Sequence, residues 1–208
     1  MTQQKNSEFE TEPNIRLSPR YSEAVAYASE WHAGQTRKGT SIPYMSHLLG
    51  VSSLVIEALG DEDQAIAALL HDAAEDCGGE PRLVEIDAMF GSRVALIVRG
   101  CSDSLVEDPK VKLPWRERKE EYIRHLQDVS PDVILVSCAD KLHNARAIWT
   151  DIQRDGVETM ERFNAPGSEI AWYYCSLLSA FELRGAPVDL LIPLREVVLN
   201  LSKALNPL

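Results

Sequence analysis

The sequence predicts an all-α protein, folded as a helical bundle in a single domain. Apolar residues recur at helical spacing in segment after segment, which is the main signal for amphipathic helices. Helix-start and helix-stop residues separate these segments, as at Ser18-Pro19 and at Gly60. A length of 208 residues suits one domain with a sizeable core. We therefore expect one domain over residues 18–208, preceded by a flexible segment over residues 1–17.

The expected helices follow one another along the chain. The first runs from Pro19 to about Gly34, with Ser18 as its N-cap. The later helices are expected at residues 43–59, 65–76, 81–90, 92–98, 114–126, 131–149, 168–184 and 188–205. The polar stretch at residues 103–113 contains Pro109 and shows no period, so it predicts a loop that could serve as a lid.

The composition indicates a reduced, cytoplasmic protein. A formal net charge of -11 argues against wholesale binding to nucleic acid or an anionic membrane, so an anionic substrate would need local positive charge. The four cysteines lie far apart and form no CxxC pair, which is the pattern of a protein without a disulfide framework. No apolar run approaches the ~18 residues needed to span a bilayer. The N-terminus lacks the apolar core of a signal peptide.

The stretch AIAALLHDAAED, residues 65–76, combines an apolar helical run with four ionisable groups. In a continuous helix His71 would lie above Glu75, and Asp72 above Asp76, on adjoining stripes. Carboxylates near a helix C-terminus face the negative end of the helix dipole, at a cost of about 0.3–1 kcal/mol for each exposed charge. A divalent metal ion would offset that charge. The alternative is an ordinary surface pair, His71-Asp72, at a fraying helix end.

Two other stretches supply what a metal site would still lack. His47 follows Pro43-Tyr44-Met45-Ser46 at the start of an apolar helix, and Asp140 directly follows the apolar run of a later helix. Together with His71 and Asp72 they give two imidazole nitrogens and two carboxylate oxygens. Such a set suits borderline to hard divalent ions such as Mn, Fe, Co or Zn and leaves positions open for water. We therefore predict that these four residues bind one divalent ion.

Five motifs, in this order, carry a resemblance to a known family: WHAGQTRK (31–38), PYMSH (43–47), LLHDAAED (69–76), FGSRVALIV (90–98) and CADKLHNAR (138–146). Across roughly residues 18–180, the chain resembles the HD superfamily of metal-dependent phosphohydrolases. Within it, the chain is most similar to the (p)ppGpp hydrolase domain of the RelA/SpoT family, in the stand-alone form called small alarmone hydrolase. The resemblance implies an HD-domain helical bundle that uses Mn²⁺ to remove the 3′-pyrophosphate of ppGpp or pppGpp, giving GDP or GTP.

The expected roles of the remaining site residues follow. Glu75 and Asp76 are placed to accept a proton from the attacking water and to support the leaving oxygen, as catalytic groups. By resemblance, Arg37 stacks on the guanine base and Lys38 meets a phosphate. Asn144 is expected to contact the sugar or a nearby phosphate. The alternatives are a solvated basic loop for Arg37 and Lys38, and a structural helix-interior amide for Asn144.

The chain departs from the family pattern near the expected nucleotide site. One more residue separates Arg37 from the metal histidine than in the long RelA/SpoT enzymes, and Ile42 and Leu48 replace an acidic residue and a proline. Ala147 stands where the family often has a threonine that helps to hold the nucleotide. His32 is expected beside the metal site as a hydrogen-bond donor, or in the core.

Three other functions remain open at this stage. The chain could hydrolyse another nucleotide, for example by removing the 2′-phosphate of NADPH. It could bind an alarmone without cutting it, although such a module has no need for the Glu75-Asp76 pair. It could also be a scaffold, which three matching stretches of metal ligands disfavour. The expected partner is a small-molecule nucleotide, and the sequence leaves the oligomeric state open.

Overall fold

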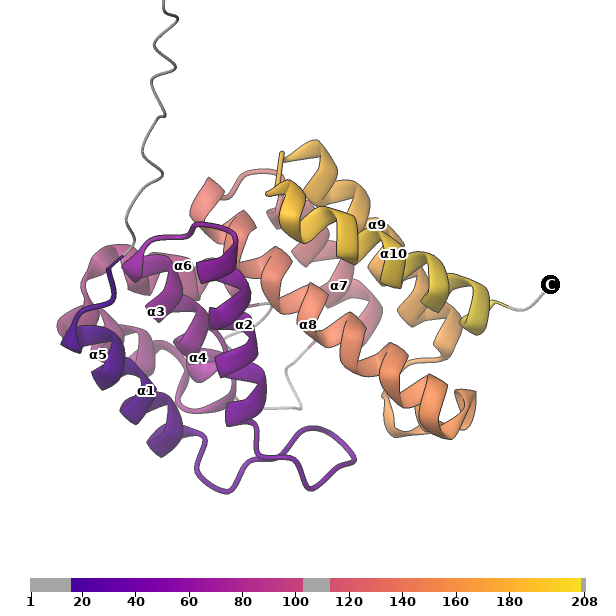
Figure 1. Ribbon diagram of the computed structural model, residues 1–208, viewed down its shortest axis with the longest axis horizontal. Coiled ribbons are helices and arrows are strands. Elements are labelled where there is room, and N and C mark those ends of the chain that lie inside the picture. Colours follow the sequence, from indigo (N-terminus) through magenta and orange to yellow (C-terminus); the bar gives the residue numbers. More distant parts are fainter. Residues whose placement is uncertain (1–15, 103–112, 207–208) are drawn as a thin grey trace, which may run out of the picture.

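The computed structural model describes residues 16–102 and 113–206, and in this part of the chain it is helical (Figure 1). The predicted all-α bundle is confirmed, since the described residues form no strand beyond one isolated bridge between Thr36 and Pro43. The elements are α1 Pro19–Trp31, α2 Met45–Glu57, α3 Glu62–Leu70, α4 Ala73–Asp76, α5 Gly79–Phe90, α6 Ser92–Cys101, α7 Trp115–His125, α8 Pro131–Asp155, the 3₁₀ helix η1 Val157–Arg162, α9 Gly167–Leu183 and α10 Val188–Leu205.

Helix α3 forms the buried centre of the N-terminal half. Its last six residues, Ala65 to Leu70, have no solvent exposure at all. A helix that is apolar on every side is stable only when other elements surround it, and α3 packs against α1, α2, α6 and α8. Its first turn is closed by a capping box between Asp61 and Gln64. The stretch that carries His71 is therefore held rigidly from its start.

Helix α8 is the longest element and connects the two halves of the molecule. Ser130 caps it, Pro131 occupies its first turn, and its residues Val133 to Asp140 are all buried. Figure 1 shows α8 passing between α2 on one side and α9 and α10 on the other, and all three pack against it. A polar residue halfway along α8 thus lies where the two halves meet.

The prediction of one continuous helix over residues 65–76 is wrong. Helix α3 ends at Leu70, His71 and Asp72 form a turn, and α4 begins at Ala73. His71 Nδ1 lies 2.9 Å from the carbonyl oxygen of Ala68, which in a continuing α-helix would accept from the Asp72 amide. Because of this break, the side chains of His71 and Asp72 converge on one cluster. In a continuous helix they would lie on two adjoining stripes of its surface.

Smaller differences concern loops and ends. Helix α5 begins at Gly79, ahead of the expected Pro81, and α8 continues past Trp149 to Asp155. The expected flexible segment falls mostly on residues 1–15, and the expected lid on residues 103–112, which both lie outside the described residues. Among the described helices, none is long and apolar enough to cross a membrane.

Candidate active site

Four side chains that lie far apart in the sequence meet in the middle of the bundle. His47 comes from α2, His71 and Asp72 from the turn between α3 and α4, and Asp140 from α8. His71 Nε2 lies 3.0 Å from Asp72 Oδ2 and 3.6 Å from Asp140 Oδ1. His47 Nε2 lies 3.3 Å from Asp140 Oδ1 and 3.6 Å from Asp72 Oδ2. The structure thus brings together the four residues that the sequence predicted as metal ligands.

The geometry and the donor atoms of this cluster fit a divalent metal ion. The Nε2 atoms of His47 and His71 are buried, yet neither makes a hydrogen bond within the described structure. Ligand atoms about 2.1 Å from one ion, at angles between octahedral and tetrahedral, are about 3.0–3.4 Å apart. The four distances between the imidazole and carboxylate atoms lie close to that range. A shared ion would satisfy both ring nitrogens at once.

Each imidazole is oriented through its other ring nitrogen. His71 Nδ1 donates to the carbonyl of Ala68, which leaves the Nε2 lone pair facing the cluster. His47 Nδ1 lies 2.9 Å from His143 Nδ1. Burial, with the nearby His47 and Arg37, lowers the pKa of His143 to about 4, so at neutral pH this ring is uncharged and can accept. A Cβ at Gly50 would collide with the His143 ring, so the glycine allows this close packing.

The neighbours of Asp140 keep its carboxylate ionised. Burial alone would raise the pKa of Asp140, but Lys141, His47 and His71 hold it well below its usual value. Lys141 Nζ and Asn144 Nδ2 each lie 2.5 Å from an Asp140 oxygen. Asn144, predicted as a substrate contact, thus donates to Asp140 in this structure.

The same carboxylates also act on His71. Burial alone would lower the pKa of His71, but Asp72 and Asp140 outweigh it and raise this pKa well above its usual value. Tyr44 adds a further contact, because its hydroxyl donates to Asp72 Oδ2 at 2.5 Å. The cluster therefore attracts positive charge strongly, whether as a proton or as a metal ion.

The predicted catalytic pair, Glu75 and Asp76, lies on the short helix α4 immediately after the cluster. Asp76 is exposed to solvent, and it accepts a hydrogen bond from Gln35 Nε2 at 2.8 Å. Partial burial and the charge of Asp72 raise the pKa of Asp76. Glu75 is half-buried on the same turn. The structure thus places an acidic pair next to the predicted metal ligands.

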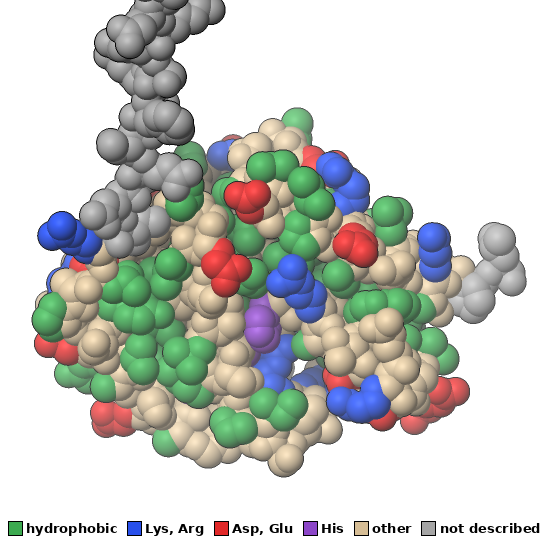
Figure 2. Space-filling view, viewed as in Figure 1, with side chains coloured by type: hydrophobic (Ala, Val, Ile, Leu, Met, Phe, Trp, Pro, Cys, Tyr) green, Lys and Arg blue, Asp and Glu red, His purple; other side chains and the backbone are tan. Residues whose placement is uncertain are grey.

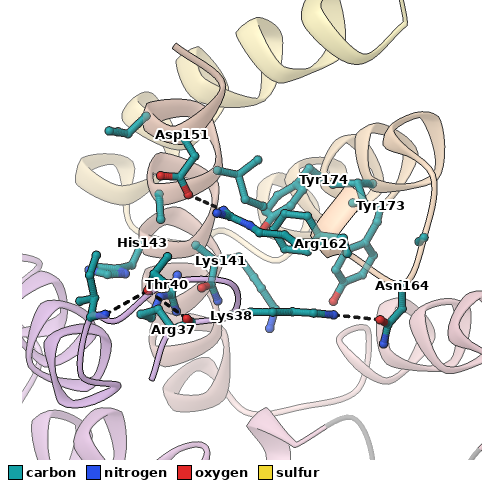
Figure 3. Close-up of a pocket in the computed structure, with 18 of the residues that line it drawn as sticks. Arg37, Lys38, Thr40, Lys141, His143, Asp151, Arg162, Asn164, Tyr173 and Tyr174 are labelled. Atoms are coloured by element: carbon teal, nitrogen blue, oxygen red, sulfur yellow. Dashed lines mark hydrogen bonds and ion pairs between the residues drawn. The ribbon is translucent and has the colours of Figure 1, made fainter. Parts of the chain in front are cut away.

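A pocket of about 520 Å³ adjoins the cluster (Figure 3). Tyr44, Lys141, His143 and Asn144 line it, and each of them also contacts one of the four clustered residues. The pocket is rich in cations, and these come from helices α7 and α8, the 3₁₀ helix η1 and the loop between α1 and α2: Arg37, Lys38, Lys119, Lys141, Arg154 and Arg162. Figure 2 shows Lys and Arg side chains beside a histidine in a hollow at the centre of one face. In a chain with a net charge of -11, this is a marked local concentration of positive charge.

Side-chain bonds join the walls of the pocket. Lys38 Nζ lies 2.9 Å from Asn164 Oδ1, and Arg162 forms an ion pair with Asp151, as Figure 3 shows. Gly39 has a φ of +72°, and a Cβ there would lie 2.8 Å from Arg162 Cδ. The loop that carries Lys38 therefore passes closely over the η1 segment.

Only some of the pocket residues stand out in the sequence. Arg37, Lys38 and Asn144, which the sequence predicted as substrate contacts, line the pocket, and their contact with a substrate stays a prediction. Tyr44 and His143 lay inside the motifs PYMSH and CADKLHNAR, but no spacing rule singled out either residue. Arg162 and Asn164 lie in a stretch that carried no motif. Only the folded chain brings them opposite the basic loop.

This chain is similar to several known proteins. The HD-domain family model matches residues 24–162. A zebrafish (Danio rerio) protein named guanosine-3′,5′-bis(diphosphate) 3′-pyrophosphohydrolase MESH1 is 35% identical over 127 residues, which cover 60% of this chain and 66% of that protein. Its Drosophila melanogaster counterpart is 32% identical over 148 residues, covering 66% of this chain and 78% of that protein. A solved structure described as a metazoan ortholog of SpoT that hydrolyses ppGpp superposes with a TM-score of 0.70, at 28% identity and over 89% of this chain and 97% of that one.

Proposed function

The chain belongs to the HD-domain family, and from this premise we propose that it hydrolyses the 3′-pyrophosphate ester of ppGpp or pppGpp. The observation that carries the proposal is the adjacency of two features. His47, His71 and Asp72 lie close enough together to hold a divalent ion, Asp140 lies beside both histidines, and the adjoining pocket holds six cationic side chains. A guanosine tetra- or pentaphosphate carries phosphate groups at both ends of its ribose, so it requires both features together. The 3′-pyrophosphohydrolase activity in the names of the two relatives points the same way.

The reaction balances as a simple hydrolysis. A water oxygen bonds to the phosphorus attached to the ribose 3′ oxygen, and that P–O3′ bond breaks. The 3′ oxygen takes a proton, and the products are GDP or GTP and pyrophosphate. His47, His71, Asp72 and Asp140 would hold the divalent ion, which supplies Lewis acidity and makes a water more acidic when bound. We assign Mn²⁺ as this ion from the family resemblance and the mixed nitrogen and oxygen ligands.

The chain's own residues supply the proton transfer and the positioning. Asp76 and Glu75 accept the proton that the water loses and return one to the 3′ oxygen, a contribution typically worth 10²–10⁴-fold. The raised pKa of Asp76 suits an acid-base group, because it brings the value closer to neutral pH. Arg37 would stack on the base, and Lys38 and Lys141 would neutralise phosphate charge at the two ends of the pocket.

Product analysis tests this proposal directly. Purified protein with Mn²⁺ is incubated separately with ppGpp, pppGpp, NADPH and GTP, and the products are separated by ion-exchange chromatography. We expect pyrophosphate with GDP from ppGpp and with GTP from pppGpp. The control is the double variant His71→Ala, Asp72→Ala, which should lose Mn²⁺ binding and turnover together.

Other outcomes would identify a different function. Intact ppGpp in the presence of bound Mn²⁺ would reject the proposal. Release of phosphate from NADPH under the same conditions would instead indicate a 2′-phosphatase. Binding of ppGpp without cleavage of any nucleotide would indicate an alarmone-binding module.

A further inference from the structure

The loop between α1 and α2 has the form of a hairpin whose stem is closed by backbone hydrogen bonds. Tyr44 N donates to the Gln35 carbonyl at 2.9 Å, and Arg37 N donates to the Ile42 carbonyl at 2.8 Å. The stem residues Gln35 and Tyr44 face the site, and Arg37 at the end of the stem and Lys38 next to it line the pocket. One short segment therefore reaches both the substrate pocket and the acidic residues beside the cluster.

Each stem side chain holds one carboxylate. The Tyr44 hydroxyl donates to Asp72, one of the four residues of the His47-His71-Asp72-Asp140 cluster. The Gln35 amide donates through Nε2 to Asp76 Oδ2 at 2.8 Å. Asp76 lies at the end of a helix of four residues and is exposed, and among the described residues the hydrogen bond to its carboxylate comes from Gln35. The amide of Gln35 is thus placed to choose one orientation of that carboxylate.

The amide of Gln35 is itself held in one orientation. Its Oε1 lies 2.7 Å from His32 Nδ1, and since its Nε2 is engaged with Asp76, the imidazole must be the donor. His32 is only 4% exposed and stacks on the Tyr44 ring, with ring centroids 5.3 Å apart and an interplanar angle of 24°. Two hydrogen bonds therefore connect His32, Gln35 and Asp76 in series, and His32, the first of the three, is buried in the core.

We infer that Gln35 is a positioning residue that holds the Asp76 carboxylate toward the reacting water, and that His32 fixes the amide of Gln35 for this purpose. The inference rests on the proposed function, in which Asp76 transfers a proton. A neutral amide can fix the direction of a carboxylate without forming an ion pair that would compete for its charge. Catalytic groups lose much of their effect when they are misplaced by about 1 Å, so the loss of this bond should appear in turnover.

The first test uses Gln35→Met, which keeps the length of the side chain and removes the donor. We expect kcat on ppGpp to fall about 10- to 100-fold, as is typical when an outer partner of a site residue is removed. KM and the Mn²⁺ affinity measured by calorimetry should stay within about twofold, because neither a phosphate contact nor a metal ligand is altered. The matched control is Gln153→Met, which makes the same change at an exposed position of α8. A fall in Mn²⁺ affinity that matches the fall in kcat would contradict the inference.

A double-mutant cycle separates positioning from a general structural effect. In an Asp76→Asn background, Gln35→Met should lower kcat by less than about twofold further, because the group that it positions is already disabled. If the two losses multiply instead, Gln35 does not act through Asp76, and the inference is wrong.

His32 provides a second and independent variant pair. In His32→Asn the side-chain amide can take the place of the Nδ1 donor, so kcat should stay within about fivefold of wild type. In His32→Phe the ring remains but the donor is lost, and kcat should fall as far as in Gln35→Met. Equal kcat values in the two His32 variants would contradict the role of the hydrogen-bonded series His32–Gln35–Asp76.

Crystal structures of the wild type and Gln35→Met keep this inference distinct from the proposed function. The Asp76 carboxylate should leave its position in the variant, whatever nucleotide the enzyme cuts. A carboxylate that stays in place would overturn the inference even if ppGpp is the substrate. A wild-type protein that leaves ppGpp intact would overturn the proposed function, while the two crystal structures would still decide the role of Gln35.

Discussion

The cluster of His47, His71, Asp72 and Asp140 and the neighbouring pocket are formed by different kinds of structural element. Each cluster residue comes from a helix or from a turn between buried helices, and its orientation is set by a carbonyl or by a neighbouring side chain. The pocket combines helix α8 with a hairpin loop, a 3₁₀ segment and the loop after it, and side-chain bonds join these walls. Rigid helices suit chemistry that tolerates little displacement, whereas loops can change with the substrate. The comparison predicts that changes in the cluster affect kcat and stability, and that changes in the pocket affect KM.

The largest effect is expected for Asp140→Asn. Metal affinity and kcat should fall more than about 100-fold, beyond the usual loss for an outer partner of a metal ligand. The variant should also lose about 3 kcal/mol of unfolding free energy, because Lys141 is largely buried and loses its anionic partner. Calorimetry with Mn²⁺, turnover of ppGpp and denaturation in urea would measure the three effects.

Asp72→Asn is the matched comparison for that variant. It removes the same type of ligand, but the Asp72 side chain is 22% exposed and no lysine or arginine pairs with it among the described residues. Metal binding and turnover should be lost to a similar extent, with a smaller loss of stability. Equal losses of unfolding free energy in the two variants would show that Lys141 does not depend on Asp140.

A moderate effect, on KM alone, is expected for Lys38→Met. A charge-assisted hydrogen bond contributes about 1.5–3 kcal/mol, so KM for ppGpp should rise at least tenfold. kcat should stay within about twofold, because the cluster and α4 are untouched. Lys203→Met, at an exposed site on α10, is the control for the loss of one positive charge. A fall in kcat without a change in KM would mean that the pocket and the cluster are not separable in this way.

A smaller effect, of the opposite sign, is expected for Ala147→Thr. Ala147 lines the pocket on α8, at the position where the family often carries a threonine. A restored hydroxyl should lower KM by about two- to fivefold, corresponding to one hydrogen bond of about 0.5–1 kcal/mol. Ala147→Val adds nearly the same volume without the hydroxyl and should not lower KM. If both variants bind ppGpp equally well, shape and not hydrogen bonding governs this position.

The difference between the cluster and the pocket also explains which parts of the site could be predicted from the sequence. His47, His71, Asp72 and Asp140 each stand at a recognisable place on an apolar helix, so residue type and spacing were enough to group them. The break after Leu70 was not predictable from the helical period, because it depends on the bond between the His71 ring and a carbonyl of its own helix. The pocket was only partly predictable. Its walls depend on contacts between residues that are more than a hundred positions apart, such as Lys38 and Asn164.

The smallest effect is expected at an ion pair remote from both regions, where Asp132 at the start of α8 accepts from Arg93 of α6 at 2.9 Å. Asp132→Asn should reduce the unfolding free energy by about 0.5–1 kcal/mol, the usual value for a partly exposed pair, and leave kcat and KM unchanged. Arg93 lowers the pKa of Asp132 in the folded protein. Its contribution is therefore complete above the unfolded value of about 4 and is lost as the pH falls through the lower folded value. Urea denaturation of both proteins between neutral and acidic pH should show the difference shrinking in that window, and a constant difference would assign it to something other than this charge.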